Sequence, residues 1–131
     1  MASNGRRSMP TTRILTVDDS RSMRALLRMT LAGNGFEVIE AEDGQAALDW
    51  LEDHDVDLII TDINMPRLDG FGLIGRLREE RRRHVGRPIL VLTTEASDEK
   101  RALARAAGAT GWIVKPFDPE RLIAAVRHVV H

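Results

Sequence analysis

Residues 58–66 read Leu-Ile-Ile-Thr-Asp-Ile-Asn-Met-Pro, an aliphatic run that ends in an acid and a proline-containing loop. Aliphatic and β-branched residues without interruption are typical of a strand that is buried on both faces. Similar runs occur at residues 14–17, 38–39, 89–93 and 112–114. The sequence therefore predicts five short strands, of which residues 58–61 form the third.

Helical segments separate the predicted strands. Apolar residues recur at the spacing of one helix face in segments 23–31, 47–51, 71–77, 102–107 and 122–130. Asp43-Gly44, Asp69-Gly70 and Gly108 mark turns or helix ends between these segments. Strands that alternate with helices in this way form a parallel sheet covered on both faces. We expect an α/β fold, a (βα)5 doubly wound parallel sheet.

The composition describes one ordinary globular domain. The chain has 131 residues, of which 43% are hydrophobic and 30% are charged. We expect a flexible leader at residues 1–11, a domain at residues 12–131 and no output domain. The net charge of −1 gives no overall attraction for nucleic acid, and no apolar run is long enough for a membrane span. Because the chain has no cysteine, disulfides and thiolate metal sites are excluded, which suits a cytoplasmic protein.

Polar side chains stand where the predicted strands end. Asp18 and Asp19 follow the first strand, and Asp62 follows the third. Thr93 ends the fourth strand, and Lys115 follows the fifth. In open parallel sheets, ligands bind beyond the carboxyl ends of the strands, near the point where the strand order reverses. We therefore expect these residues to form one site.

Such a site has a recognisable chemistry. Neighbouring carboxylates repel one another unless a positive charge lies between them, and Mg²⁺ is a hard cation that prefers oxygen ligands. Asp19 and Asp62 are candidate direct ligands, and Asp18 is a candidate ligand through water. Asp62 could then attack a phosphoryl group as a carboxylate nucleophile and form an aspartyl phosphate. Lys115 and Thr93 would bind the phosphoryl oxygens.

Together, these motifs resemble the receiver domains of two-component response regulators, and within them the CheY-type chemotaxis regulators. The resemblance covers residues 12–131 and rests on the segments at residues 14–19, 58–66, 69–70, 92–96, 106–109 and 111–117. It implies a flavodoxin-like (CheY-like) fold with strand order 2-1-3-4-5, an order that spacing alone does not give. The resemblance also implies a signalling protein rather than an enzyme, one that catalyses its own phosphorylation and dephosphorylation.

The resemblance assigns roles to individual residues. Asp62 matches the phosphoacceptor, and Asp18 and Asp19 match the acidic pair that holds Mg²⁺. The backbone carbonyl of Asn64 matches the third protein ligand of the metal. Lys115 matches the lysine that pairs with the phosphoryl group, and its bond to the following proline matches one that is cis in this family.

Other residues match the switch and its output face. Thr93 matches the hydroxyl that moves toward the phosphoryl group. Trp112 stands at the switch aromatic position, where CheY-type regulators more often have tyrosine, so it lacks a hydroxyl to bond an incoming peptide. Arg101, Trp112 and Val114 fall on the family's usual output face. Glu95 and Asn64 flank the position of the hydrolytic water, and their pairing favours the chemotaxis branch.

The expected partners follow from this resemblance. A CheA-like histidine kinase would donate the phosphoryl group, the flagellar motor switch would be the target, and the protein would be a monomer. The alternative is a single-domain receiver outside chemotaxis, or a phosphate sink, that acts on a kinase or phosphorelay.

Two other classes fit less well. An aspartyl-phosphate hydrolase would require Asp-x-Asp-x-Thr after the first strand, where this chain has Asp18-Asp19-Ser20. A flavin carrier would require a phosphate-binding loop at the same place, and two acids there would repel the flavin phosphate.

Overall fold

The computed structural model describes residues 11–79 and 86–130, and most of the expected leader lies outside these residues. The described residues form five strands and five helices in strict alternation. The strands are β2 (Arg13–Val17), β3 (Glu37–Ala41), β4 (Leu58–Thr61), β5 (Ile89–Thr93) and β6 (Gly111–Val114). The helices are α1 (Arg21–Ala32), α2 (Gly44–Leu51), α3 (Gly70–Leu77), α4 (Asp98–Ala107) and α5 (Pro119–Val130). All the predicted strands and helices are present.

The strands form one parallel sheet in the order β3-β2-β4-β5-β6. Counted along the chain, this is the order 2-1-3-4-5, so the predicted flavodoxin-like fold is confirmed. The chain moves to one side from β2 to β3 and then returns to the other side of β2 with β4. The point of reversal therefore lies between β2 and β4, where ligands of such sheets bind.

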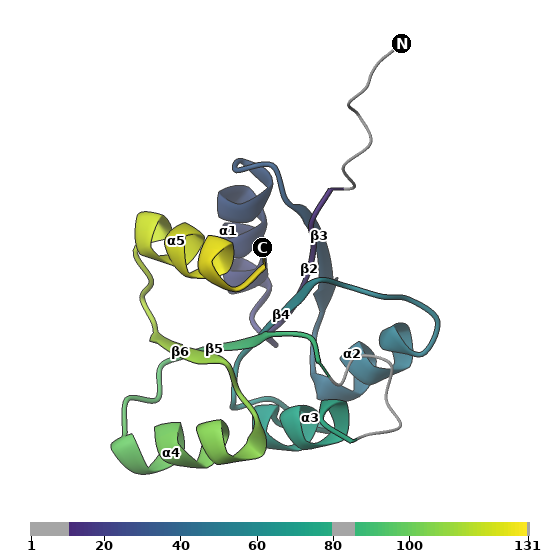
Figure 1. The fold of residues 1–131 in the computed structure, drawn as a ribbon, viewed down its shortest axis with the longest axis vertical. Helices are drawn as coiled ribbons and strands as arrows, with labels where there is room; N and C mark the ends of the chain where they lie inside the picture. Colours follow the sequence, from purple (N-terminus) through teal and green to yellow (C-terminus); the bar gives the residue numbers. More distant parts are fainter. Residues whose placement is uncertain (1–10, 80–85, 131) are drawn as a thin grey trace.

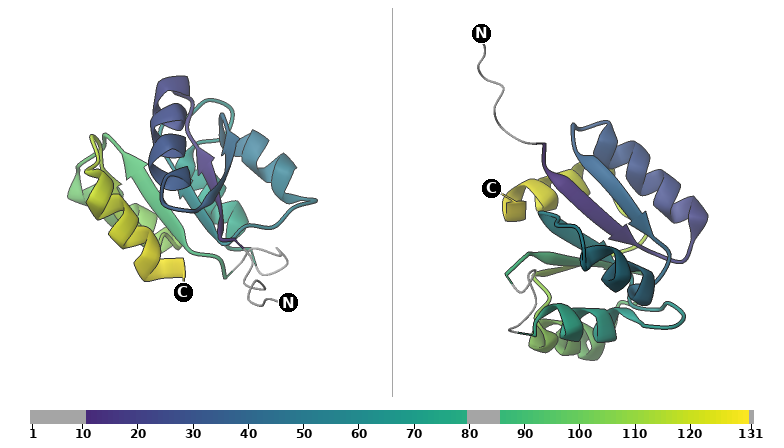
Figure 2. Two further views of the ribbon diagram at one scale, coloured as in Figure 1. Left: turned by 90° about the horizontal axis from the view of Figure 1, so that it is seen from above. Right: turned by 90° about the vertical axis from the view of Figure 1, so that its right-hand side faces the viewer.

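Helices cover both faces of the sheet. Figure 1 shows α1 and α5 on one side and α2, α3 and α4 on the other, and Figure 2 shows the same layers from two further directions. Successive side chains of a strand point to opposite faces, so Ile14 packs with the α1 and α5 side and Leu15 packs with the α2, α3 and α4 side. This is why the three central strands, β2, β4 and β5, are buried almost throughout.

Side-chain caps fix where four of the helices begin. The side chains of Ser20, Asp43, Asp69 and Ser97 each accept a hydrogen bond from the backbone N–H three residues further along the chain. Such a bond satisfies one of the N–H groups that a helix start leaves without a partner. At the end of α4, Gly108 adopts a left-handed conformation with φ of 118°, which glycine takes without strain. The predicted turn residues therefore act as helix boundaries.

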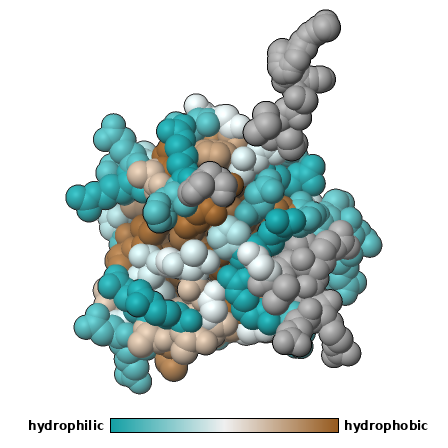
Figure 3. Space-filling view, in the orientation of Figure 1, coloured by the Kyte–Doolittle hydropathy of each residue, from teal (hydrophilic) through white to brown (hydrophobic). Residues whose placement is uncertain are grey.

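The helices differ in how much they bury. α5 buries Leu122, Ile123 and Val126, whereas Ala104 is the buried residue of α4. Leu103 on α4 is instead exposed. Figure 3 shows hydrophobic surface over α5 and a smaller area over α4, set among hydrophilic side chains. In the described part of the chain, no helix is long and apolar enough to span a membrane.

Candidate functional site

The strand register places two acids side by side. Val17 of β2 pairs with Thr61 of β4, and each is followed at once by an aspartate, Asp18 and Asp62. The backbone N–H of Asp62 donates to the carbonyl of Val17 over 2.9 Å, which continues the ladder past the strand ends. The two carboxylates therefore meet at the predicted edge, at the reversal point of the sheet.

Lys115 reaches the same point from the other side. Thr93 of β5 pairs with Val114 of β6, and the backbone N–H of Lys115 donates to the Thr93 carbonyl over 2.8 Å. The Lys115 Nζ lies 2.7 Å from Asp18 Oδ2 and 2.8 Å from Asp62 Oδ2. Its peptide bond to the following proline is cis, as the resemblance implies.

This ion-pair cluster is nearly buried. The side chains of Lys115, Asp18 and Asp62 are 10%, 3% and 11% exposed. Burial alone would lower the pKa of Lys115, but its hydrogen bonds to Asp18 and Asp62 outweigh burial and raise that pKa above its ordinary value. The ammonium therefore stays charged and offsets the repulsion between the two carboxylates.

Backbone groups hold the remaining carboxylate oxygens. Asp62 Oδ1 accepts from the N–H of Ile63 over 2.6 Å and from the N–H of Asn64 over 3.4 Å. Asp18 Oδ1 accepts from the N–H of Ser20 over 2.8 Å. The helix cap of α1 is Ser20, so neither acid after β2 serves as that cap. Asp18 is therefore available to the site instead of being used as a helix cap.

Asp19 does not join the other two carboxylates. Its residue is exposed, and among the described residues no three Asp, Glu, His or Cys side chains form a group that could hold a metal ion. The structure thus brings together two of the three predicted acids, with a lysine between them. The donors are nevertheless of the kind that Mg²⁺ takes, because it is typically held by one or two carboxylates together with water and phosphate oxygens.

The switch residues form a connected chain next to this cluster. Thr93 is fully buried, and its hydroxyl accepts from the backbone N–H of Glu95 over 3.3 Å. The carbonyl of Glu95 accepts from the indole Nε1 of Trp112 over 3.2 Å. The Glu95 carboxylate pairs with Lys100 of α4 at 3.1 Å. The tryptophan that lacks a hydroxyl thus uses its indole N–H within the protein.

Two arginines beside the site were missed by sequence reasoning. Arg24 donates to the carbonyl of Asp18 over 2.6 Å and to the Glu40 carboxylate over 3.1 Å. Arg67 donates twice to Asp43, at the start of α2. The Arg24–Glu40 and Arg67–Asp43 pairs join residues 16 and 24 positions apart, so no local spacing reveals them.

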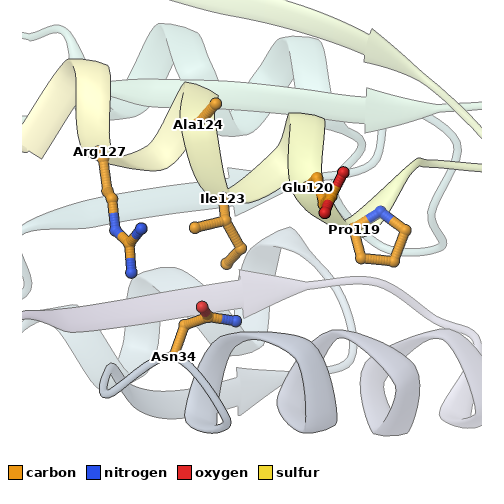
Figure 4. Close-up of a pocket in the computed structure, with 6 residues that line it drawn as sticks. All are labelled: Asn34, Pro119, Glu120, Ile123, Ala124 and Arg127. Carbon is orange, nitrogen blue, oxygen red and sulfur yellow. The ribbon is translucent and has the colours of Figure 1, made fainter.

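Two pockets lie away from the acid cluster. Arg101 and Trp112 line one beside the C-terminal part of α4, so these two predicted output residues are neighbours. Another pocket, of about 330 Å³, lies between α5 and the turn after α1 (Figure 4). The residues that line it are Asn34, Pro119, Glu120, Ile123, Ala124 and Arg127, and none is a predicted site residue.

Comparisons with known proteins agree with this geometry. The family model for the response regulator receiver domain matches residues 14–127. Response regulator MprA of Mycobacterium sp. (strain KMS) is 42% identical over 115 residues, which are 88% of this chain and 49% of that protein. Transcriptional regulatory protein CpxR of Escherichia coli (strain K12) is 36% identical over 118 residues, which are 90% of this chain and 49% of that protein. The chain thus spans about half the length of the curated relatives it matches.

Solved structures show the same likeness over more than nine-tenths of their length. The chemotaxis protein CheY4 of Vibrio cholerae has a TM-score of 0.86 and 42% identity, with 92% of this chain and 99% of that chain covered. A CheY-like receiver domain protein of Methanospirillum hungatei JF-1 has a TM-score of 0.84 and 28% identity, with 91% and 93% covered. Sequence, fold and site geometry agree, and the chain belongs to the receiver domains of two-component response regulators.

Proposed function

We propose that Asp62 accepts a phosphoryl group from a histidine kinase in a reaction that depends on Mg²⁺. The observation that carries this proposal is the position of Lys115 Nζ, which lies 2.8 Å from Asp62 Oδ2 and 2.7 Å from Asp18 Oδ2. A carboxylate nucleophile thus lies beside a fixed positive charge, at the reversal point of a parallel sheet.

The transfer step uses the residues of this cluster. A carboxylate oxygen of Asp62 attacks the phosphorus, an O–P bond forms, and the P–N bond to the donor histidine breaks. The electron pair of the broken bond returns to the imidazole nitrogen. Lys115 then pairs with the phosphoryl oxygens, and the Thr93 hydroxyl donates a hydrogen bond to one of them.

The metal site of this proposal uses the acids around Asp62. Asp18, Asp19 and Asp62 would hold Mg²⁺ with the backbone carbonyl of Asn64, directly or through water. The ion supplies positive charge that neutralises the oxygens of the transferring group. Before phosphorylation, the Lys115 ammonium already provides part of this neutralisation through its contacts with Asp18 and Asp62.

The same proposal links the site to an output face. Movement of the Thr93 hydroxyl toward the phosphoryl group would free the N–H of Glu95, for which it is now the acceptor. The loop that carries Glu95 is also bonded to Trp112 and Lys100, so a shift there would reach both residues. Trp112, Arg101 and Val114 would then present a changed surface to a partner.

Chemotaxis is the pathway that we propose. The chemotaxis protein CheY4 of Vibrio cholerae is 42% identical to this chain and has the same fold. Asn64 and Glu95 are the residue pair that the resemblance places around the hydrolytic water in this branch. The protein would be a cytoplasmic monomer that receives its phosphoryl group from a CheA-like kinase and binds the flagellar motor switch.

A second candidate is supported by the curated relatives. CpxR is a transcriptional regulatory protein, and this chain corresponds to about half of it, 49%. The same receiver chemistry would then serve a regulator outside chemotaxis, or a phosphate sink in a phosphorelay. Asp62 and Lys115 have the same roles in either case.

The first experiment measures the intact mass after exposure to Mg²⁺ and a small phosphodonor. We expect one added phosphoryl group on the wild type, none without Mg²⁺, and none on Asp62→Asn. An adduct that persists in Asp62→Asn would place the acceptor elsewhere. Absence of any adduct on the wild type, together with failure to bind beryllofluoride, would rule out the receiver chemistry.

The second experiment separates the two candidates. Purified CheA-type kinase is used as donor, and binding of the phosphorylated product to a flagellar motor switch protein is measured by calorimetry. Binding that strengthens on phosphorylation supports the chemotaxis role. Transfer from the kinase without any change in binding would favour the phosphate-sink role.

A further inference from the structure

We infer that Arg67 is a positioning residue that, by pairing with Asp43, holds the loop after the phosphoacceptor in the shape that binds Mg²⁺. This inference rests on the proposed function. The loop, called the acceptor loop below, consists of residues 62–69 and joins β4 to α3. It contains Asn64, whose backbone carbonyl is a proposed metal ligand.

Arg67 adopts an unusual backbone conformation at the tip of this loop. Its φ is 65°, and among the described residues it is the only non-glycine with a positive φ. The N–H of Leu68 donates to the carbonyl of Pro66 over 2.7 Å, so the turn closes across Arg67. Three-residue turns with positive φ at the centre are rare and strained, so the surrounding structure must hold this one in place.

The arginine side chain supplies a strong restraint. Arg67 Nε lies 2.8 Å from Asp43 Oδ2, and its second guanidinium nitrogen lies 3.1 Å from Asp43 Oδ1. Asp43 is buried and caps α2 by accepting from the N–H of Ala46 over 2.8 Å. Two parallel bonds from one guanidinium fix orientation as well as distance. The tip of the acceptor loop is therefore joined to a rigid helix start.

A second contact at the tip is made by the backbone. The N–H of Gly44 donates to the carbonyl of Leu68 over 3.1 Å. A Cβ at Gly44 would lie 2.5 Å from that same oxygen, so the loop can approach α2 this closely only because the residue is glycine. The Arg67–Asp43 pair and the Gly44–Leu68 hydrogen bond therefore hold two neighbouring residues of the loop, Arg67 and Leu68.

The other end of the acceptor loop is closed at its base. The N–H of Gly70 donates to the carbonyl of Ile63 over 2.8 Å, and a Cβ at Gly70 would lie 2.4 Å from the carbonyl oxygen of Asp62. Asn64 lies between this base and the contacts at Arg67. Its carbonyl is placed by the path of the backbone, so loss of the tip contact would move a proposed ligand without touching Asp62.

The expected consequence is on metal affinity rather than on the transfer step. Groups that hydrogen-bond directly to metal ligands typically contribute 10- to 100-fold to metal affinity, and Arg67 lies one step further from the ion. We expect Arg67→Ala to weaken Mg²⁺ binding on the order of tenfold, near the lower figure, because the loop keeps its base contacts. At saturating Mg²⁺, the phosphorylation rate should return close to that of the wild type. Arg67→Lys keeps the charge but not the paired geometry, and should recover only part of the affinity.

A matched control distinguishes positioning from general stability. Arg87 makes a similar two-nitrogen contact with Asp55, at 2.8 and 3.3 Å. These residues precede β5 and β4, so they lie at the amino ends of the strands, away from the site. Arg87→Ala should leave the Mg²⁺ affinity unchanged even if its unfolding free energy falls as much as that of Arg67→Ala.

The test is Mg²⁺ titration by calorimetry without phosphodonor, for wild type, Arg67→Ala, Arg67→Lys and Arg87→Ala. The amide NMR signals of residues 62–69 are recorded without metal to show whether the loop moves. Equal affinity in wild type and Arg67→Ala, or equal weakening in Arg87→Ala, would overturn the inference and leave the proposed function intact. A wild type that binds no Mg²⁺ would overturn both.

Discussion

The indole Nε1 of Trp112 lies 3.2 Å from the carbonyl oxygen of Glu95 and joins β6 to the loop after β5. The N–H of that same Glu95 donates to the hydroxyl of Thr93. One residue thus connects the switch hydroxyl and the switch aromatic through its two backbone groups. The indole of Trp112 is therefore coupled to the position of this loop, although Trp112 lacks the hydroxyl that a tyrosine would have.

Trp112 should report the phosphorylated state by its fluorescence. The chain has two tryptophans, and the other one, Trp50, stacks on His54 at 4.3 Å between ring centroids. In a Trp50→Phe background, we expect beryllofluoride with Mg²⁺ to shift the emission of Trp112, because the loop at Glu95 changes its bonds. Adding Thr93→Val, which removes the hydroxyl that accepts from the Glu95 N–H, should abolish the shift. A shift that survives this change would show that the loop does not respond through Thr93.

Lys115→Met should destabilise the protein and make Mg²⁺ stabilise it more. Removing one partner from a buried ion pair costs about 3–5 kcal/mol, because the remaining charge has no partner. Here Asp18 and Asp62 would face each other without the ammonium. Unfolding in urea measures this loss in chelator, and added Mg²⁺ should recover part of it.

Lys100→Met is the control for that experiment. Its pair with Glu95 is much less buried, with side chains 43% and 28% exposed, so its loss should cost about 1 kcal/mol or less and should not depend on Mg²⁺. Equal effects of the two substitutions would show that the Lys115 cluster has no special electrostatic role.

Asn64→Ala and Glu95→Ala should change how long the phosphoryl group persists without preventing its transfer. Both residues flank the proposed path of the hydrolytic water, and Glu95 is also tied to Lys100. A change of about 1.4 kcal/mol in the hydrolysis barrier alters the rate tenfold, and we expect changes of up to roughly that size. The decay of the intact-mass adduct measures them. Unchanged decay in both variants would remove this support for the chemotaxis branch.

Acid should weaken the Asp43–Arg67 pair. The hydrogen bonds from Arg67 lower the pKa of the Asp43 carboxyl, burial opposes them, and the N–H of Ala46 adds to the lowering. A lowered pKa stabilises the fold above the carboxyl's ordinary value of about 3.9, and this contribution is lost as the pH falls through the lowered value. Asp43→Asn keeps the helix cap but lacks the charge.

The corresponding measurement compares the unfolding free energy of wild type and Asp43→Asn from pH 7 to pH 3. The difference should be constant above about pH 5 and should shrink below about pH 4. A difference that stays the same at every pH would mean that the charge of Asp43 does not contribute.

Most of the fold could be predicted from the pattern of apolar residues. Periodicity and aliphatic runs located every strand and helix, because buried parallel strands and amphipathic helices leave direct patterns. The meeting of Asp62 with Lys115 was predictable for a related reason, since the carboxyl ends of parallel strands share one edge. The strand order came from the resemblance, because spacing does not say which strands are neighbours.

Contacts made by long side chains could not be predicted. Lys115 lies between Asp18 and Asp62, whereas the sequence pattern predicts a metal ion there and Lys115 at the phosphoryl group. Arg67 pairs with Asp43 from a backbone conformation with positive φ. No residue type in the loop predicts that conformation. Such contacts are set by the final backbone path and not by local pattern.

The shallow seating of α4 has a consequence for how the output face can change. A helix whose core contacts come mainly from the methyl groups of Ala104 and Ala107 gives up little hydrophobic stabilisation when it separates from the sheet. α5, with three buried aliphatic side chains, gives up far more. Local opening of α4 should therefore cost less free energy than local opening of α5. The domain can then change the position of one helix while its two cores stay folded.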